Sequence, residues 1–137
     1  MEYTFWVDII GGKKYKKIVH YLCNVSDAIY FTYYDDYMIN DDIFKFSKMC
    51  KKVTIPHQLT RKISVNENVV GYEIDIHIIH YIFEFSSIYD LLKDRVYGTI
   101  FFYNGEKEVL LIHLGDFNEI YIQTNQVELI KEFRGLR

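Results

Sequence analysis

Three side chains that could perform acid–base or metal chemistry stand at alternate positions, at Glu73, Asp75 and His77. On an extended strand this spacing places all three on one face. Two carboxylates and an imidazole suit a divalent metal ion or proton transfer. Successive positions on such a face lie about 6.5–7 Å apart, so three in a row rarely converge on one ion. The solvated face of an antiparallel strand has the same pattern, and both interpretations stay open.

A second candidate is an acidic and aromatic stretch between a predicted strand and a predicted helix. Tyrosine offers a large contact area at little entropic cost, and several aspartates would steer a basic partner. These aspartates also have a purely structural explanation. Asp41 and Asp42 would stabilise the N-terminus of the predicted helix, and Asp35 and Asp36 are common turn residues. The residues expected at a partner interface are Tyr34, Asp35, Asp36, Tyr37, Asp41 and Asp42.

The other reactive residue types form no coherent site. His77 and His80 would point to opposite faces of a strand, and His80 is expected in the core because isoleucines surround it. The run from Gly11 to Lys14 has the composition of a phosphate-binding turn but lacks the Walker and dinucleotide spacings. Cys23 and Cys50 have no zinc-type spacing, and we expect reduced thiols. We expect no cofactor, bound metal ion or disulfide.

The bulk composition limits the class of protein. The chain has 137 residues, of which 50% are hydrophobic and 18% aromatic, with a single proline. This length is typical of one domain, and the composition excludes a disordered chain. The formal net charge of −3 disfavours a protein that binds nucleic acid through its phosphates. No apolar run reaches the roughly 18 residues of a membrane span, and no secretion signal is evident. We therefore expect a cytoplasmic protein.

Strands are predicted where apolar residues alternate or form short β-branched and aromatic runs. A weak alternation over Leu59–Val65 adds a short strand before the turn at 66–68. Asn104 and Gly105 lie between two apolar runs and predict a two-residue hairpin turn. The main predicted strands are 3–10, Ala28–Tyr34, Val70–Phe85, Tyr97–Tyr103, Glu106–Leu114 and Glu119–Gln123.

Helices are predicted where apolar residues recur every three or four positions. Lys13–Cys23 has such a stripe, although it would also fit the return strand of a hairpin, and we favour the helix. Asn40 is a suitable N-cap for a helix reaching Val53. A short helix follows Ser86 or Ser87, and a closing helix after residue 124 should point Val127, Ile130 and Phe133 inward.

Hairpin connections dominate this order of elements. The expected fold class is therefore α+β: a mainly antiparallel sheet with about four helices packed against it, in a single domain. The hairpin over 97–114 is apolar on both faces, with Ile100, Phe102, Val109 and Leu111 expected on one of them. Either the chain covers both faces, or one face meets a second copy in a homodimer.

The acidic aromatic stretch, the small size and the lack of a coherent catalytic set favour a non-enzymatic binding protein. We expect a cytoplasmic inhibitor of the immunity or antitoxin kind, acting on a basic protein partner through Tyr34–Asp42. One alternative is a metal-dependent phosphoesterase-type enzyme that uses Glu73, Asp75 and His77. The other is a ligand-sensing or dimeric regulatory domain.

Overall fold

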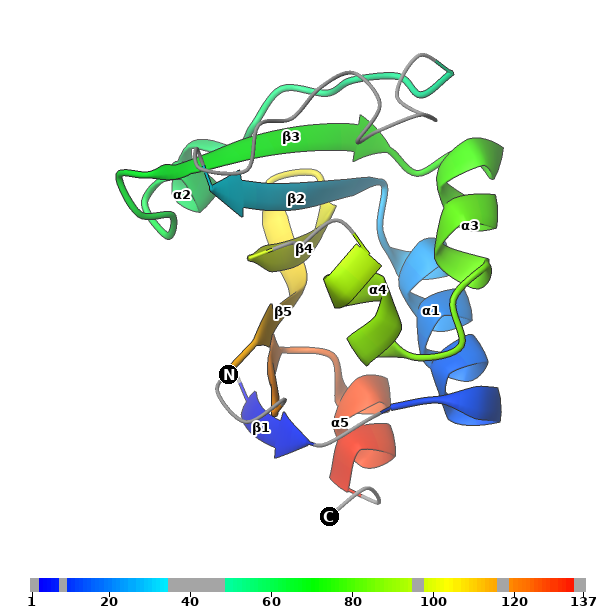
Figure 1. Ribbon diagram of the computed structural model, residues 1–137. Helices are drawn as coiled ribbons and strands as arrows, with labels where there is room; N and C mark the ends of the chain where they lie inside the picture. Colours follow the sequence, from blue (N-terminus) through cyan, green and yellow to red (C-terminus); the bar gives the residue numbers. More distant parts are fainter. Residues whose placement is uncertain (1–2, 8–9, 35–48, 95–97, 116–118, 135–137) are drawn as a thin grey trace.

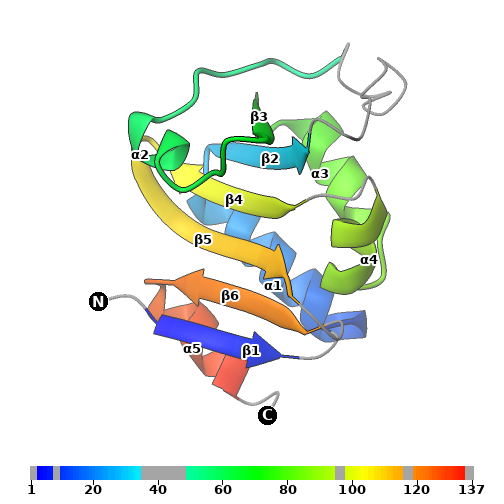
Figure 2. The ribbon, with the colours of Figure 1, turned by 60° about the vertical axis from the view of Figure 1, so that its left-hand side comes forward.

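The computed structural model describes residues 3–7, 10–34, 49–94, 98–115 and 119–134. Six antiparallel strands in these ranges form one sheet, in the order β1-β6-β5-β4-β2-β3 (Figure 2). The arrangement confirms the predicted α+β class with a mainly antiparallel sheet. The strands are β1 (Tyr3–Val7), β2 (Ala28–Tyr34), β3 (Glu67–Glu73), β4 (Thr99–Asn104), β5 (Lys107–Leu114) and β6 (Ile120–Thr124).

Helices lie on both faces of the sheet, in unequal numbers (Figures 1 and 2). Four cover one face and bury a large core cluster that includes Leu22, Ile82 and Phe102. The short helix α2 (His57–Thr60) lies on the other face, where Leu59 packs with side chains of the central strands. The four helices on the first face are α1 (Gly12–Val25), α3 (Ile76–Phe83), α4 (Ile88–Asp94) and α5 (Val127–Arg134).

The two central strands, β4 and β5, are covered on both faces within the chain. Ile100 and Phe102 are buried under the helices, whereas Phe101 and Tyr103 are each only 1% exposed beneath the segment that carries α2. Most of the apolar surface from which a homodimer through 97–114 was predicted is thus buried inside one chain over the described residues 98–114.

The hairpin between β4 and β5 forms as predicted, but its turn is shifted by one residue. Asn104 pairs with Lys107, which leaves Gly105 and Glu106 in the turn, and Gly105 has a φ of 62°. A bulge beside Phe102 then places Phe102 opposite Leu110. One extra residue exchanges the two faces of a strand. The predicted grouping of Leu111 with Phe102 is therefore wrong, because Leu111 lies on the opposite face with Phe101 and Tyr103.

The long strand predicted over Val70–Phe85 is wrong in its second half. Strand β3 ends at Glu73, and helix α3 begins at Ile76. The Asp75 carboxylate accepts hydrogen bonds from the backbone N–H groups of His77 (2.9 Å) and Ile78 (3.1 Å). These bonds satisfy two of the donors that a helix start leaves unpaired. A short run that is apolar on all sides fits a buried helix as well as a strand, so periodicity alone could not decide.

Helix α1 confirms the helical interpretation of Lys13–Cys23. Its apolar stripe of Tyr15, Ile18, Val19 and Leu22 is buried, and the Tyr15 hydroxyl donates to the backbone oxygen of Ile82 on α3 (2.6 Å). The predicted cap of α4 is also confirmed, since Ser87 Oγ accepts from the backbone N–H of Asp90 (3.0 Å). No described helix is long and apolar enough to cross a membrane.

Three predicted details are corrected. The helix predicted from Asn40 to Val53 lies outside the described residues over 40–48. It does not reach Val53, which is not helical and whose N–H donates to Gly71 O of β3 (3.0 Å). The weak strand over Leu59–Val65 is instead α2 followed by a turn. Val127 of α5 is 61% exposed rather than inward, and Leu129 is buried in its place.

Candidate functional site

The structure separates the three residues of the predicted metal or acid–base site. Glu73 is exposed at the end of β3, where its carboxylate lies 3.7 Å from Lys51 Nζ. Asp75 caps α3 and His77 lies in the first turn of that helix, so the predicted single strand face does not exist. The described residues hold no group of three His, Cys, Asp or Glu side chains that could bind a metal ion. The geometric basis of this candidate site is therefore lost.

The predicted placement of the two neighbouring histidines is also wrong. His77 and His80 are three positions apart on α3 rather than on opposite faces of a strand. Residues at this spacing are neighbours on a helix. His80 is exposed and His77 half-buried, so His80 is not the core histidine that was predicted.

Tyr34 is the one predicted partner-binding residue that lies within the described ranges. It ends β2, where it is half-buried and pairs with Glu67 of β3. Burial, with Glu67 beside it, raises the pKa of the Tyr34 hydroxyl. The other predicted residues, Asp35, Asp36, Tyr37, Asp41 and Asp42, lie outside the described residues.

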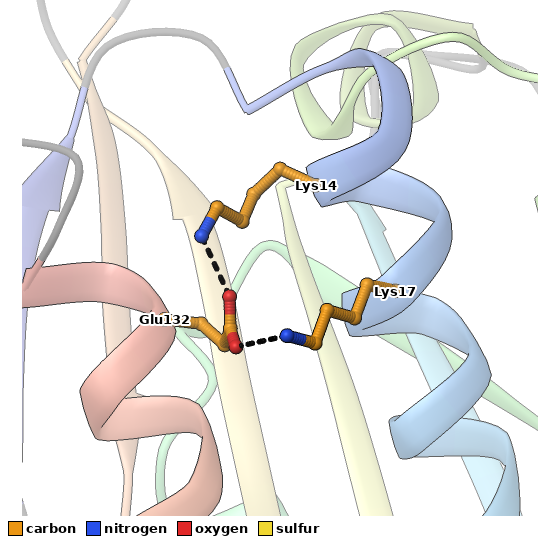
Figure 3. Close-up of polar contacts among 3 residues, drawn as sticks. All are labelled: Lys14, Lys17 and Glu132. Atoms are coloured by element: carbon orange, nitrogen blue, oxygen red, sulfur yellow. Dashed lines mark hydrogen bonds and ion pairs between the residues drawn. The ribbon is translucent and has the colours of Figure 1, made fainter.

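The lysines at the start of α1 contact groups of the protein itself. Glu132 of α5 accepts from Lys14 Nζ (2.6 Å) and Lys17 Nζ (2.7 Å), one lysine to each carboxylate oxygen (Figure 3). Lys16 Nζ donates to the backbone oxygen of Phe83 (2.7 Å). The positive charge near the Gly11–Gly12 turn is thus largely used to join α1 to α5 and α3.

At the other end of β2 from Tyr34, an open groove of about 440 Å³ lies in the surface. It runs between the start of β2, the end of β3, the β4–β5 turn and the extended segment before α2. Three carboxylates from distant parts of the sequence line it, those of Asp27, Glu73 and Glu106. We call this feature the acidic groove.

Hydrogen bonds hold Asp27 in place at the start of β2. Both of its carboxylate oxygens accept from the backbone N–H of Gly105, at 3.1 and 3.0 Å. Its own N–H donates to Tyr103 O (2.9 Å), and its backbone oxygen accepts from Ile74 N–H (3.0 Å). Asp27 therefore links β3 to the β4–β5 turn, and its carboxylate has a fixed position in the groove.

Apolar side chains share the lining of the acidic groove with the charged ones. Tyr30 is only 3% exposed, and its hydroxyl donates to the backbone oxygen of Thr54 (3.0 Å). The Tyr30 ring lies on Gly71 of β3 so closely that a Cβ there would be 2.3 Å from Cε1. Burial first, and then the Asp27 charge, raise the pKa of the Tyr30 hydroxyl. Ala28, Val53, Ile55 and Pro56 are the other apolar residues of the lining.

The charges in the acidic groove do not balance. The lining carries three carboxylates against the ammonium of Lys51, and the Lys51–Glu73 pair is long at 3.7 Å and largely solvent-exposed. Such exposed pairs are weak. Glu106 is exposed in the β4–β5 turn and forms no hydrogen bond or ion pair with the described residues. The groove thus offers negative charge and acceptor oxygens to a cationic group.

Of the three carboxylates of the acidic groove, only Glu73 belongs to a pattern that the sequence indicates as a site. Asp27, Glu73 and Glu106 belong to segments that no local spacing connects. Asp27 before a strand and Glu106 in a turn are ordinary in sequence, and only the pairing of β2 with β3 and β4 brings them together.

No family model, curated protein or solved structure gives a significant match to this chain.

Proposed function

We propose that this chain is a non-enzymatic binding protein of the cytoplasm that recognises and inhibits a basic protein partner. The observation that carries the proposal is the acidic groove, which Asp27, Glu73 and Glu106 line together with one exposed lysine. A surface patch of one charge attracts a partner of the opposite charge and accelerates its association. The predicted interface at Asp35 and Asp36 follows the other end of β2 and stays a separate prediction.

The construction of the acidic groove supports binding. Asp27 is held by four hydrogen bonds of its backbone and side chain, so its position is set before a partner arrives. A preorganised group loses little conformational entropy on binding. The alternative enzyme has less support, because the fold separates Glu73 at the end of β3 from Asp75 and His77 at the start of α3.

Affinity capture from the source cell, followed by mass spectrometry, would identify the partner. The purified partner is then tested for association with the wild type and with a Glu73→Gln/Glu106→Gln variant. We expect slower association of the variant at low salt. The difference should vanish at about 1 M NaCl, where the Debye length is about 3 Å. Inhibition is tested by adding this protein at a saturating concentration to an assay of the partner's own activity.

Glu119→Gln is the control, because it removes an exposed carboxylate outside the groove, although it removes one charge and the groove variant removes two. Glu119 precedes β6, at the opposite end of β5 from Glu106, about 25 Å away along the strand. Its association rate should equal that of the wild type. A partner that binds the groove variant at wild-type rates at low salt would overturn the role of the groove. A partner that stays fully active would refute inhibition.

A further inference from the structure

Resting on the proposed function, we infer that the acidic groove receives one arginine side chain of the partner. Apolar side chains, Tyr30 and Val53 among them, line the groove together with three carboxylates. A ligand that fits both needs an apolar stem and a cationic head. Long basic side chains have this form, because their methylene groups pack on apolar surface while the charge stays at the polar edge.

The carboxylates approach the groove from three separate elements. Asp27 precedes β2, Glu73 ends β3, and Glu106 lies in the β4–β5 turn. A guanidinium carries five N–H donors in one plane and can bond to several carboxylates at once. A lysine ammonium is a compact and strongly hydrated charge. Several separate acceptors therefore favour arginine.

The groups already in the groove leave acceptors for this arginine. Each Asp27 oxygen accepts a bond from Gly105 N–H, and a carboxylate has about four acceptor positions in total. Lys51 is the competing cation, but at 3.7 Å from Glu73 it is easily replaced. His57 also lines the groove, but a cation is already present beside it, because its Nε2 lies 3.3 Å from the Arg61 guanidinium. The arginine would therefore bind at the side formed by Asp27, Glu73 and Glu106.

In the test, the peptide acetyl-Gly-Arg-Gly-amide is titrated into the whole chain at low salt, and NMR follows the chemical shifts of the backbone amides. We expect shifts at the backbone amides of Asp27 and Gly105, which border the bound guanidinium. The matching citrulline peptide is neutral and of the same shape, and it should cause no such shifts. The lysine peptide should bind more weakly. Glu106→Gln should weaken arginine binding about two- to five-fold, the range of one exposed charge pair. Glu119→Gln should leave it unchanged.

Thermal melting of each variant verifies that it is folded before the titration. Equal binding of the arginine and citrulline peptides, or shifts confined to another surface, would overturn the inference. Equal binding of the lysine peptide would overturn the preference for arginine. If no peptide binds but the purified partner still associates in a charge-dependent manner, the arginine inference falls and the proposed function stands. If the peptide binds but the captured partner ignores the groove variants, the proposed function falls instead.

Discussion

Replacing Glu132 by Gln should destabilise the fold, because this carboxylate joins α5 to α1. It lies between Lys14 Nζ at 2.6 Å and Lys17 Nζ at 2.7 Å. The Glu132 side chain is 19% exposed, that of Lys14 36% and that of Lys17 70%. Exposed pairs contribute about 0.2–1 kcal/mol, and the Lys17 pair belongs at the low end because solvent screens it. We expect Glu132→Gln to lower the free energy of unfolding by about 0.5–1.5 kcal/mol.

Urea unfolding followed by circular dichroism measures this loss, and a double-mutant cycle divides it. Lys14→Gln should show a larger coupling to Glu132 than Lys17→Gln, because Lys14 is the less exposed lysine. Glu119→Gln removes an exposed carboxylate elsewhere and serves as the control. Equal stability of Glu132→Gln and wild type at low salt would refute the argument.

The same contact has a defined pH dependence. Hydrogen bonds from Lys14 first and Lys17 second lower the pKa of Glu132 below its usual value of 4.5. Because the folded-state pKa is the lower one, the stabilisation is complete above 4.5 and is lost as the pH falls through the folded-state value. The difference between wild type and Glu132→Gln should therefore be present at neutral pH and disappear in acid. A difference that persists after Glu132 is protonated would show that it has another origin.

Three further changes test other parts of the structure. Gly71→Ala should lower the free energy of unfolding by about 1–3 kcal/mol, measured by urea unfolding, because its Cβ would overlap the Tyr30 ring. Asp75→Ala should cost about 1 kcal/mol through loss of the α3 cap, with Asp75→Asn close to wild type, and millimolar Mg²⁺ should leave the melting temperature unchanged. Burial raises the pKa of Cys23 and Cys50 to about 11, so a disulfide reagent should label both slowly at pH 7 until the chain unfolds; rapid labelling of the folded protein would contradict this.

Local signals in the sequence were sufficient where neighbouring residues decide the structure. The stripe from Tyr15 to Leu22 correctly predicted α1, because side chains three and four positions apart share a helix face. The glycine at 105 correctly predicted a hairpin, because its positive φ fits the turn. Ser87 correctly marked the start of α4, because its hydroxyl accepts from the N–H of Asp90.

Prediction failed where the outcome depends on distant residues or on one inserted position. The apolar run after Glu73 has no strand pattern that excludes a helix, and the cap at Asp75 decided between the two. The bulge beside Phe102 has no local signal, yet it exchanges the faces of β5. The acidic groove depends on the strand order, which brings Asp27 next to the β4–β5 turn, where its carboxylate accepts from the N–H of Gly105, the residue before Glu106.

The pairing of β1 with β6 has a consequence for the order in which the sheet is completed during synthesis. Val7 pairs with Ile120, which lies 113 positions further along the chain. Contacts between residues so far apart in sequence form late, since the entropy of closing a long loop is lost before the contact is gained. A chain emerging from the ribosome therefore carries β1 without its partner until most of the other strands have been made. Its half-buried Phe5 and exposed Trp6 are accessible to chaperones, or to the β1 strands of other nascent chains, throughout that interval.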